Sequence, residues 1–147
     1  MQLTELNTDI ISELLLLLTQ FTQIRHRILK QNIQCAGTQK YLPKDLRADE
    51  FSEILNHAIT EYILNQRLIL RDTDTISFGP NATVRFTPVP DPEARTLLNQ
   101  NKTDYVQFQN RKIKENSLNE IIAKKLLGIK RKINTCPDGP MASRDMV

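Results

Sequence analysis

The sequence predicts a mainly α-helical fold with long helices at both ends of the chain. We expect these helices to pack as a coiled-coil-like hairpin, with a shorter middle helix and a small β-hairpin or loop insertion between them. Apolar residues near both ends recur in alternating steps of four and three, the period that keeps one stripe facing a partner helix. Of the 147 residues 39% are hydrophobic but only 5% aromatic, without any Trp, which favours an aliphatic helical core. This length suits one domain.

The N-terminal helix is expected over residues 1–36. Gly37 should end it in the left-handed conformation that glycine adopts readily at helix ends. The helix carries an unbroken apolar stripe, here called the N-terminal seam. Its members are Ile10, Leu14, Leu17, Phe21, Ile24 and Ile28.

A connector and a middle helix follow. Residues 37–48 surround Pro43 and should form the connector. A helix is then expected over 49–70, with Asp49 as its N-cap and Phe51 on its apolar face.

Residues 71–102 differ in character from the helices on either side. The stretches 75–78 and 83–87 are β-prone, and the Gly-Pro-Asn sequence between them is typical of a turn. We therefore expect a short hairpin or an ordered loop. Three prolines then follow, and we expect them to prevent regular structure, because proline lacks the backbone N–H that helices and sheets use. They are Pro88, Pro90 and Pro92.

The C-terminal helix is expected over residues 103–134, followed by a flexible tail over 135–147. Its apolar positions, here called the C-terminal seam, should pair with the N-terminal seam. A lone two-helix hairpin would be marginal, since ordering each residue costs about 1–2 kcal/mol. Several copies packed together would bury more of each helix. The C-terminal seam consists of Leu118, Ile122, Leu126, Ile129 and Ile133.

No residue pattern points to catalysis, a cofactor or a metal, so we expect a protein that is not an enzyme. His26 and His57 lack the nearby second ligand that a metal site needs. Nucleophile, base and phosphate-loop groupings are absent from the sequence. Cys35 and Cys136 are too far apart for a CxxC pair, and a disulfide between them stays open. The net charge of +3 does not argue for nucleic acid.

The leucine run at residues 14–18 is not expected to insert stably into a membrane. Extending it to about 20 residues includes Glu13, Arg25 and Arg27, and each charge costs about 2.5–3.5 kcal/mol at a bilayer centre. Acidic residues rather than basic ones precede it, and no small-residue cleavage site follows. We therefore expect no cleaved signal peptide.

Residues 25–46 form the most specific stretch of the sequence. They resemble the N-terminal signature of the bacterial flagellar rod and hook proteins, R-Q-x-V-L-A-x-N-I-A-N-A-D-T-P-G-Y-x-x-x-D. The short connector is most similar to that of the proximal rod members. The chain departs from the signature at Cys35 and Gly37, and it has Gln39-Lys40 in place of Pro-Gly. The residues in register are Arg25, Ile28, Leu29, Asn32, Ile33, Ala36, Thr38, Tyr41 and Asp45.

A weaker resemblance lies in the C-terminal helix. Residues 101–104, 115–118 and 124–130 are similar to the family's N-T-V-D, E-N-S-L and G-L-K segments, although the spacing agrees only after small shifts. Gln107 and Gln109 stand where the family usually has carboxylates.

The resemblance implies a rod-type domain over the whole chain. Such a chain would be a structural subunit of the flagellar basal body, assembled in the periplasmic rod. It would leave the cell through the flagellar type III export apparatus. Its partners would be copies of itself, homologous rod subunits and the protein at the MS-ring junction.

Three further residues join the two seams as the expected assembly interface. Asn32 would cap or cross-link the helix end at a subunit contact, or would be an ordinary polar residue near a helix end. Tyr41 would anchor the connector onto the helix pair, or would be a simple core tyrosine. Ile33 lies between them in the signature.

Two other functions are compatible with the sequence. Lys and Arg residues over 124–132 could bind nucleic acid, but on a helical wheel they scatter on both sides of the apolar line. The chain could also be a cytosolic coiled-coil adaptor that never leaves the cell.

Overall fold

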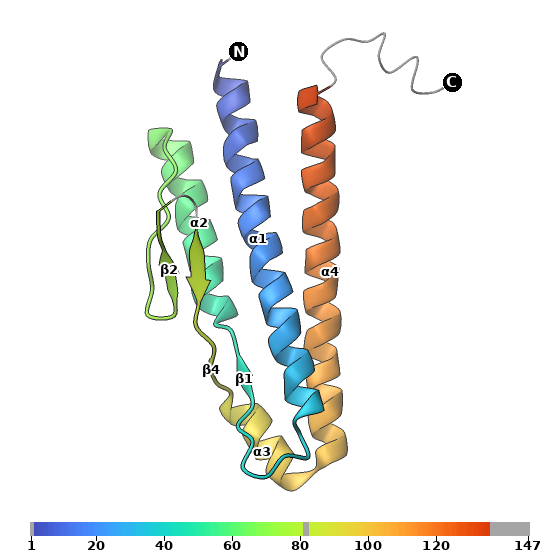
Figure 1. The fold of residues 1–147 in the computed structure, drawn as a ribbon. Helices are drawn as coiled ribbons and strands as arrows, with labels where there is room; N and C mark the ends of the chain where they lie inside the picture. Colours follow the sequence, from blue (N-terminus) through green and yellow to red (C-terminus); the bar gives the residue numbers. More distant parts are fainter. Residues whose placement is uncertain (1, 81–82, 136–147) are drawn as a thin grey trace, which may run out of the picture.

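The computed structural model describes residues 2–80 and 83–135 and confirms the predicted fold class. Helices α1 (Gln2–Gln34) and α4 (Lys102–Thr135) run antiparallel and side by side, so the start of α1 and the end of α4 lie together (Figure 1). Beyond Thr135, the predicted tail and Cys136 lie outside the described residues.

The segment between the two long helices adds two shorter helices and two small antiparallel sheets. Strands β2 and β3 form the predicted hairpin, with Ile76 opposite Phe86. Strands β1 and β4 join the connector to the segment before α3. The bounds are β1 (Lys44–Asp45), α2 (Ala48–Asn65), β2 (Ile76–Phe78), β3 (Val84–Phe86), β4 (Val89–Pro90) and α3 (Pro92–Gln100).

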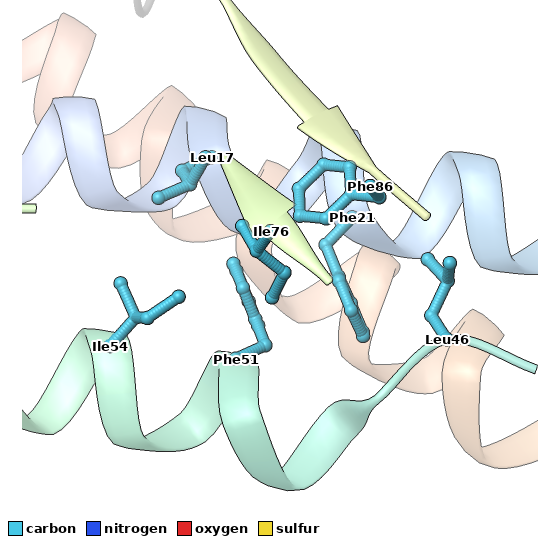
Figure 2. Close-up of a cluster of buried hydrophobic side chains, with 7 residues drawn as sticks. All are labelled: Leu17, Phe21, Leu46, Phe51, Ile54, Ile76 and Phe86. Carbon is cyan, nitrogen blue, oxygen red and sulfur yellow. The ribbon is translucent and has the colours of Figure 1, made fainter. Parts of the chain in front are cut away.

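The hydrophobic core lies between α1, α2 and the β2–β3 hairpin (Figure 2). Phe21 stacks on Phe51 with ring centroids 4.2 Å apart, and Phe86 meets both rings edge-on. The hairpin therefore closes the core. Leu17 and Phe21 of the N-terminal seam face this core, so within one chain this seam does not pair with α4 as predicted. The core residues are Leu17, Phe21, Leu46, Phe51, Ile54, Ile76 and Phe86.

Helix α4 turns a different face towards α1 than the sequence predicts. Its buried residues repeat at helical spacing but are partly polar: Tyr105, Gln109, Asn116, Ala123 and Leu127. The predicted C-terminal seam is instead exposed, because it lies on the other side of the helix from these residues. The side chain of Ile133 lies outside the described part of the chain. The exposed fractions are 57% for Leu118, 47% for Ile122, 46% for Leu126 and 54% for Ile129.

Helix α3 corrects the prediction that the prolines prevent regular structure. Asp91 is its N-cap and accepts a hydrogen bond from the backbone N–H of Ala94 at 3.2 Å. Pro92 occupies the first turn, where a helix needs no N–H donor. Pro90 pairs in β4. The β and loop region thus ends at Pro90 rather than at residue 102.

The left-handed backbone positions also differ from those predicted. Gly37 does not have a positive φ, whereas Lys40 (φ 63°) and Gln66 (φ 57°) do. Gln66 ends α2 at Asn65, earlier than the predicted residue 70. Arg47 rather than Asp49 is the N-cap position of α2, which places Asp49 in the first turn.

Replacing Lys40 with Gly is expected to stabilise the fold by about 0.5–1 kcal/mol. A side chain at positive φ clashes with its own backbone, and glycine removes that clash at some cost in unfolded-chain entropy. Urea unfolding followed by circular dichroism measures the change. Gln39→Gly is the matched control. Gln39 is exposed and not among the positive-φ residues, so there the substitution should only destabilise. A loss of stability in Lys40→Gly would contradict the prediction.

Candidate assembly surface and the junction that positions it

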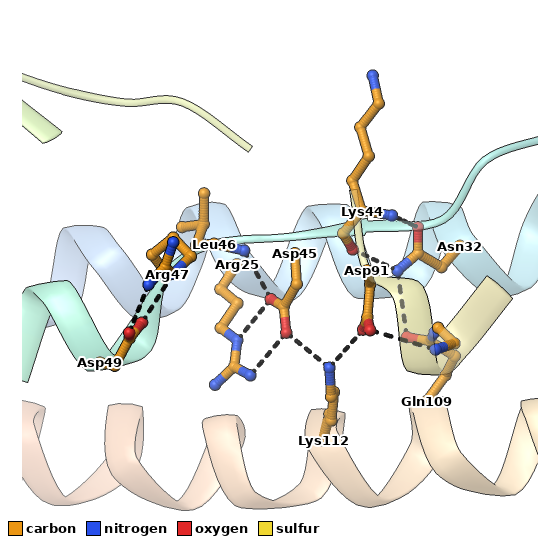
Figure 3. Close-up of polar contacts among 11 residues, drawn as sticks. Arg25, Asn32, Lys44, Asp45, Leu46, Arg47, Asp49, Asp91, Gln109 and Lys112 are labelled. Atoms are coloured by element: carbon orange, nitrogen blue, oxygen red, sulfur yellow. Dashed lines mark hydrogen bonds and ion pairs between the residues drawn. The ribbon is translucent and has the colours of Figure 1, made fainter. Parts of the chain in front are cut away.

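Polar residues of the signature meet where α1 gives way to the connector, and we call this cluster the junction (Figure 3). Asn32 is fully buried at its centre. Its amide nitrogen donates to the carbonyl of Lys44 at 2.7 Å and to Oε1 of Gln109 at 3.1 Å. Its amide oxygen accepts from the Tyr41 hydroxyl at 2.8 Å and from the backbone N–H of Lys44 at 3.2 Å. One side chain therefore ties α1 to both the connector and α4.

A charge cluster of two cations and two carboxylates completes the junction (Figure 3). Arg25 donates two parallel hydrogen bonds to Asp45, at 2.8 and 2.9 Å. Lys112 of α4 donates to Asp45 at 2.9 Å and to Asp91 at 2.7 Å. Every one of these side chains is at most 21% exposed. Since the formal charges cancel, the cluster joins α1, β1, α4 and the start of α3 without a net buried charge.

The titration behaviour of the junction follows from this pairing. Burial alone would raise the pKa of Asp45, but the hydrogen bonds and charges of Arg25 and Lys112 outweigh burial. They hold that pKa below its ordinary value of 3.8. Burial alone would lower the pKa of Lys112, but Asp45 and Asp91 raise it above 10.5. Burial raises the pKa of Tyr105 to about 12. All of these groups therefore keep one protonation state at neutral pH.

Residues of the weaker C-terminal resemblance also make contacts within the chain. Asn116 is buried, and its amide donates to the carbonyl of Thr22 at 2.7 Å. The side-chain oxygen of Asn101 accepts from the backbone N–H groups of Thr103 and Asp104, at 3.0 and 3.2 Å. Asn101 therefore caps the start of α4 directly after α3.

The structure shows the contacts that Asn32 and Tyr41 make within one chain. Asn32 cross-links the helix end to its own connector and to α4, and a subunit contact at this position stays a prediction. The Tyr41 hydroxyl anchors the connector onto α1, as predicted. The Tyr105 hydroxyl, which the sequence analysis did not single out, donates to the carbonyl of Asn32 at 2.8 Å. Gln109 Nε2 is buried with no hydrogen-bond partner among the described residues.

The outward side of α4 changes character along its length. In the first half it carries exposed polar residues such as Asn110, Arg111 and Lys114. From Leu118 onward it carries large apolar side chains that are each roughly half exposed. We call these five residues the α4 stripe: Leu118, Ile121, Ile122, Leu126 and Ile129. Because they recur at helical spacing, they form one continuous surface.

Most of the other exposed large apolar residues in the described part of the chain lie at the same end of the molecule, the exception being Leu42 in the connector. Ile11 and Leu16 are exposed near the start of α1, and Ile59, Ile63 and Leu64 near the end of α2. Helix α2 runs in the same direction as α4, and α1 runs opposite to both (Figure 1). These patches and the α4 stripe therefore share the end that lies away from the junction. Apolar surface gathered in this way commonly marks an interaction site.

The remaining predicted interface residues are partly covered by their own chain. They contribute less free surface than the α4 stripe, and Ile24 and Ile28 pack against the hydrophobic core. The members of this group are Ile10, Leu14, Ile24, Ile28, Ile33 and Tyr41.

The described residues do not gather three potential metal-ligating side chains in one place. None of the described helices combines the length and apolar character needed to span a bilayer. Comparisons with protein-family models, with curated proteins and with solved structures found no match for this chain.

Proposed function

We propose that this chain is a structural, non-enzymatic subunit of the proximal rod of a bacterial flagellum, a divergent relative of the rod protein FlgB. The observation that carries the proposal is the α4 stripe. Five large apolar side chains, each between 46% and 57% exposed, lie along the outward side of α4 in its second half. Because each side chain is already about half buried, covering the rest of it against an adjacent subunit would contribute about 0.8–1.5 kcal/mol.

The position of the signature residues supports the resemblance to rod proteins. Arg25, Asn32, Tyr41 and Asp45 are spread over 21 positions of the sequence, yet all four take part in the junction. A signature that fixes the angle between the connector and the helices would need polar residues at the positions where these elements meet, as in the junction. Lys40 has a left-handed φ where the family signature has Gly, which is the conformation that glycine adopts most readily.

The proposal includes the environment that a rod subunit requires. The chain would pass through the flagellar type III export apparatus without losing a signal peptide and assemble in the periplasm. Its partners would be copies of itself, homologous rod subunits and the protein at the MS-ring junction. The junction would then act within each subunit, holding α1 and α4 at a fixed relation so that the α4 stripe is presented outward.

Replacing Ile129 with Glu is expected to reduce the number of flagella per cell at least tenfold in a bacterium that depends on this gene. A carboxylate in the α4 stripe would have to lose its hydration on assembly, which is costly without a partner. Ile129 is 54% exposed, so the isolated subunit should fold normally. Electron microscopy counts the flagella, and circular dichroism of the purified chain checks the fold.

The matched control is Asn110→Glu, which adds the same charge on the outward polar part of α4. Flagella should form at normal number in this variant. Normal flagellation in Ile129→Glu would contradict the assembly role of the α4 stripe. Retention of the wild-type chain in the cytoplasm of a flagellated cell would instead favour an adaptor protein.

A further inference from the structure

The exposed side of α2 changes character along the helix in the same way as the outward side of α4. Its first half carries the exposed carboxylates Asp49 and Glu53. Its second half carries Ile59, Ile63 and Leu64, which are 46%, 66% and 71% exposed. Ile63 and Leu64 are thus among the most exposed large apolar residues in the part of the chain that the structure describes.

The exposed charges ahead of the apolar surfaces differ between the two helices. On α4 the nearest ones are Arg111, Lys114 and Glu115, of which two are basic, whereas on α2 they are Asp49 and Glu53. Asp49 is paired with Arg47 at 2.6 Å. Glu53, Arg111 and Lys114 form no ion pair within the described part of the chain. Glu53 and Lys114 are therefore available to a partner.

The spacing of charge and apolar surface also agrees between the helices. With a rise of about 1.5 Å per residue, Ile59 and Ile63 lie about 9 and 15 Å beyond Glu53. Leu118 and Ile122 lie about 6 and 12 Å beyond Lys114. The two patterns match to within one helical turn when the helices run in the same direction. In the molecule both helices start at the junction end (Figure 1).

We propose that α4 of one copy packs alongside α2 of a second copy, in the same direction, with Lys114 facing Glu53 and the α4 stripe covering Ile59 and Ile63. The partner surface is on a different helix from the α4 stripe, so the contact is heterologous. Each copy then has one surface of each kind free, and association can continue into a ring or a helix. This inference rests on the proposed function and adds the surface that receives the α4 stripe.

A charge-reversal series with Glu53→Lys and Lys114→Glu tests the contact. Like charges placed opposite each other are unfavourable at an interface, so each single reversal should weaken self-association about fivefold or more. The double variant restores opposite charges and should recover association to within about twofold of the wild type. Sedimentation equilibrium of the purified chains measures the dissociation constants. Both residues are exposed, so the fold should survive, and circular dichroism checks this.

Glu93→Lys, an exposed charge reversal on α3, is the control and should leave association unchanged. If Lys114→Glu weakens association but Glu53→Lys does not, the α4 stripe meets another surface and this inference is overturned, while the proposed function stands. A wild-type chain that stays monomeric at millimolar concentration also overturns it. Normal flagellation in Ile129→Glu would instead count against the proposed function itself.

Discussion

Replacing Asp45 with Asn is expected to lower the free energy of unfolding at neutral pH by about 3–5 kcal/mol, the usual cost of breaking a buried ion pair. The substitution keeps the shape of the side chain but removes the charge that holds Arg25 and Lys112. Both cations are mostly buried, at 16% and 21% exposed. Their desolvation would then be balanced only in part, by Asp91. Urea unfolding gives the change.

The pH dependence of stability provides a second measurement on the same variant. Because folding depresses the pKa of Asp45, this carboxylate stabilises the fold above its ordinary pKa of 3.8. That contribution is lost as the pH falls through the lower, folded-state value. The wild type should therefore lose stability more steeply below about pH 4 than Asp45→Asn does. Glu93→Gln, at an exposed site on α3, is the control. Equal acid slopes in wild type and Asp45→Asn would show that the ion pair does not form.

Replacing Asn32 with Ala is expected to destabilise the fold by about 2–4 kcal/mol, the second largest effect. The amide makes four hydrogen bonds in a fully buried position. Its removal would leave the backbone N–H and carbonyl of Lys44 and the side-chain oxygen of Gln109 without these hydrogen bonds. Each unsatisfied buried group costs about 1–3 kcal/mol. Differential scanning calorimetry or urea unfolding measures the loss.

Gln31→Ala is the matched control for Asn32→Ala. Gln31 is the preceding residue on α1 and its side chain is exposed, so its loss should change stability by less than about 0.5 kcal/mol. If both variants lose the same small amount, the network around Asn32 contributes little. A large loss in Asn32→Ala alone would support an intramolecular role for the signature asparagine.

The sequence was sufficient to predict the two long helices but not the face that each one buries. Apolar spacing assigned Leu118 and Ile122 to the interior of the helix pair. In the structure the side of α4 that faces α1 carries residues such as Gln109 and Asn116, whose side-chain amides form hydrogen bonds with α1. An apolar residue is not necessarily buried, because much of the surface of any protein is also apolar. The partners of an amide are set by tertiary contacts that periodicity does not show.

Two local features could have been predicted from signals that the sequence does contain. Asp91 followed by Pro92 is a common start for a helix, since aspartate caps the free N–H groups and proline fits the first turn. The prediction that Pro92 prevents regular structure is wrong for this reason, and α3 was therefore not predicted. The left-handed turn was predicted at Gly37 but occurs at Lys40, because residue preference is weaker than the geometry imposed on the connector. The signature alignment had marked Lys40 as a glycine position.

The junction was only partly accessible from the sequence. The resemblance singled out Arg25, Asn32, Tyr41 and Asp45, and all four belong to it. Lys112 and Asp91 carried no local signal, because their pairing joins residues far apart in the chain. A charge pair of this kind becomes visible only when the tertiary arrangement is known.

The uneven distribution of polar contacts has a consequence for how the molecule moves. Among the described side chains, the hydrogen bonds that join α1 to α4 lie between Tyr105 and Asn116 on α4, whereas the residues buried beyond Asn116 are the apolar Ala123 and Leu127. Local opening requires the least free energy where few buried contacts must break. The backbone amides of α4 between Asn116 and Ile129 should therefore exchange their hydrogens sooner than those near the junction, and this part of the helix can adjust its position when a neighbouring subunit packs on it.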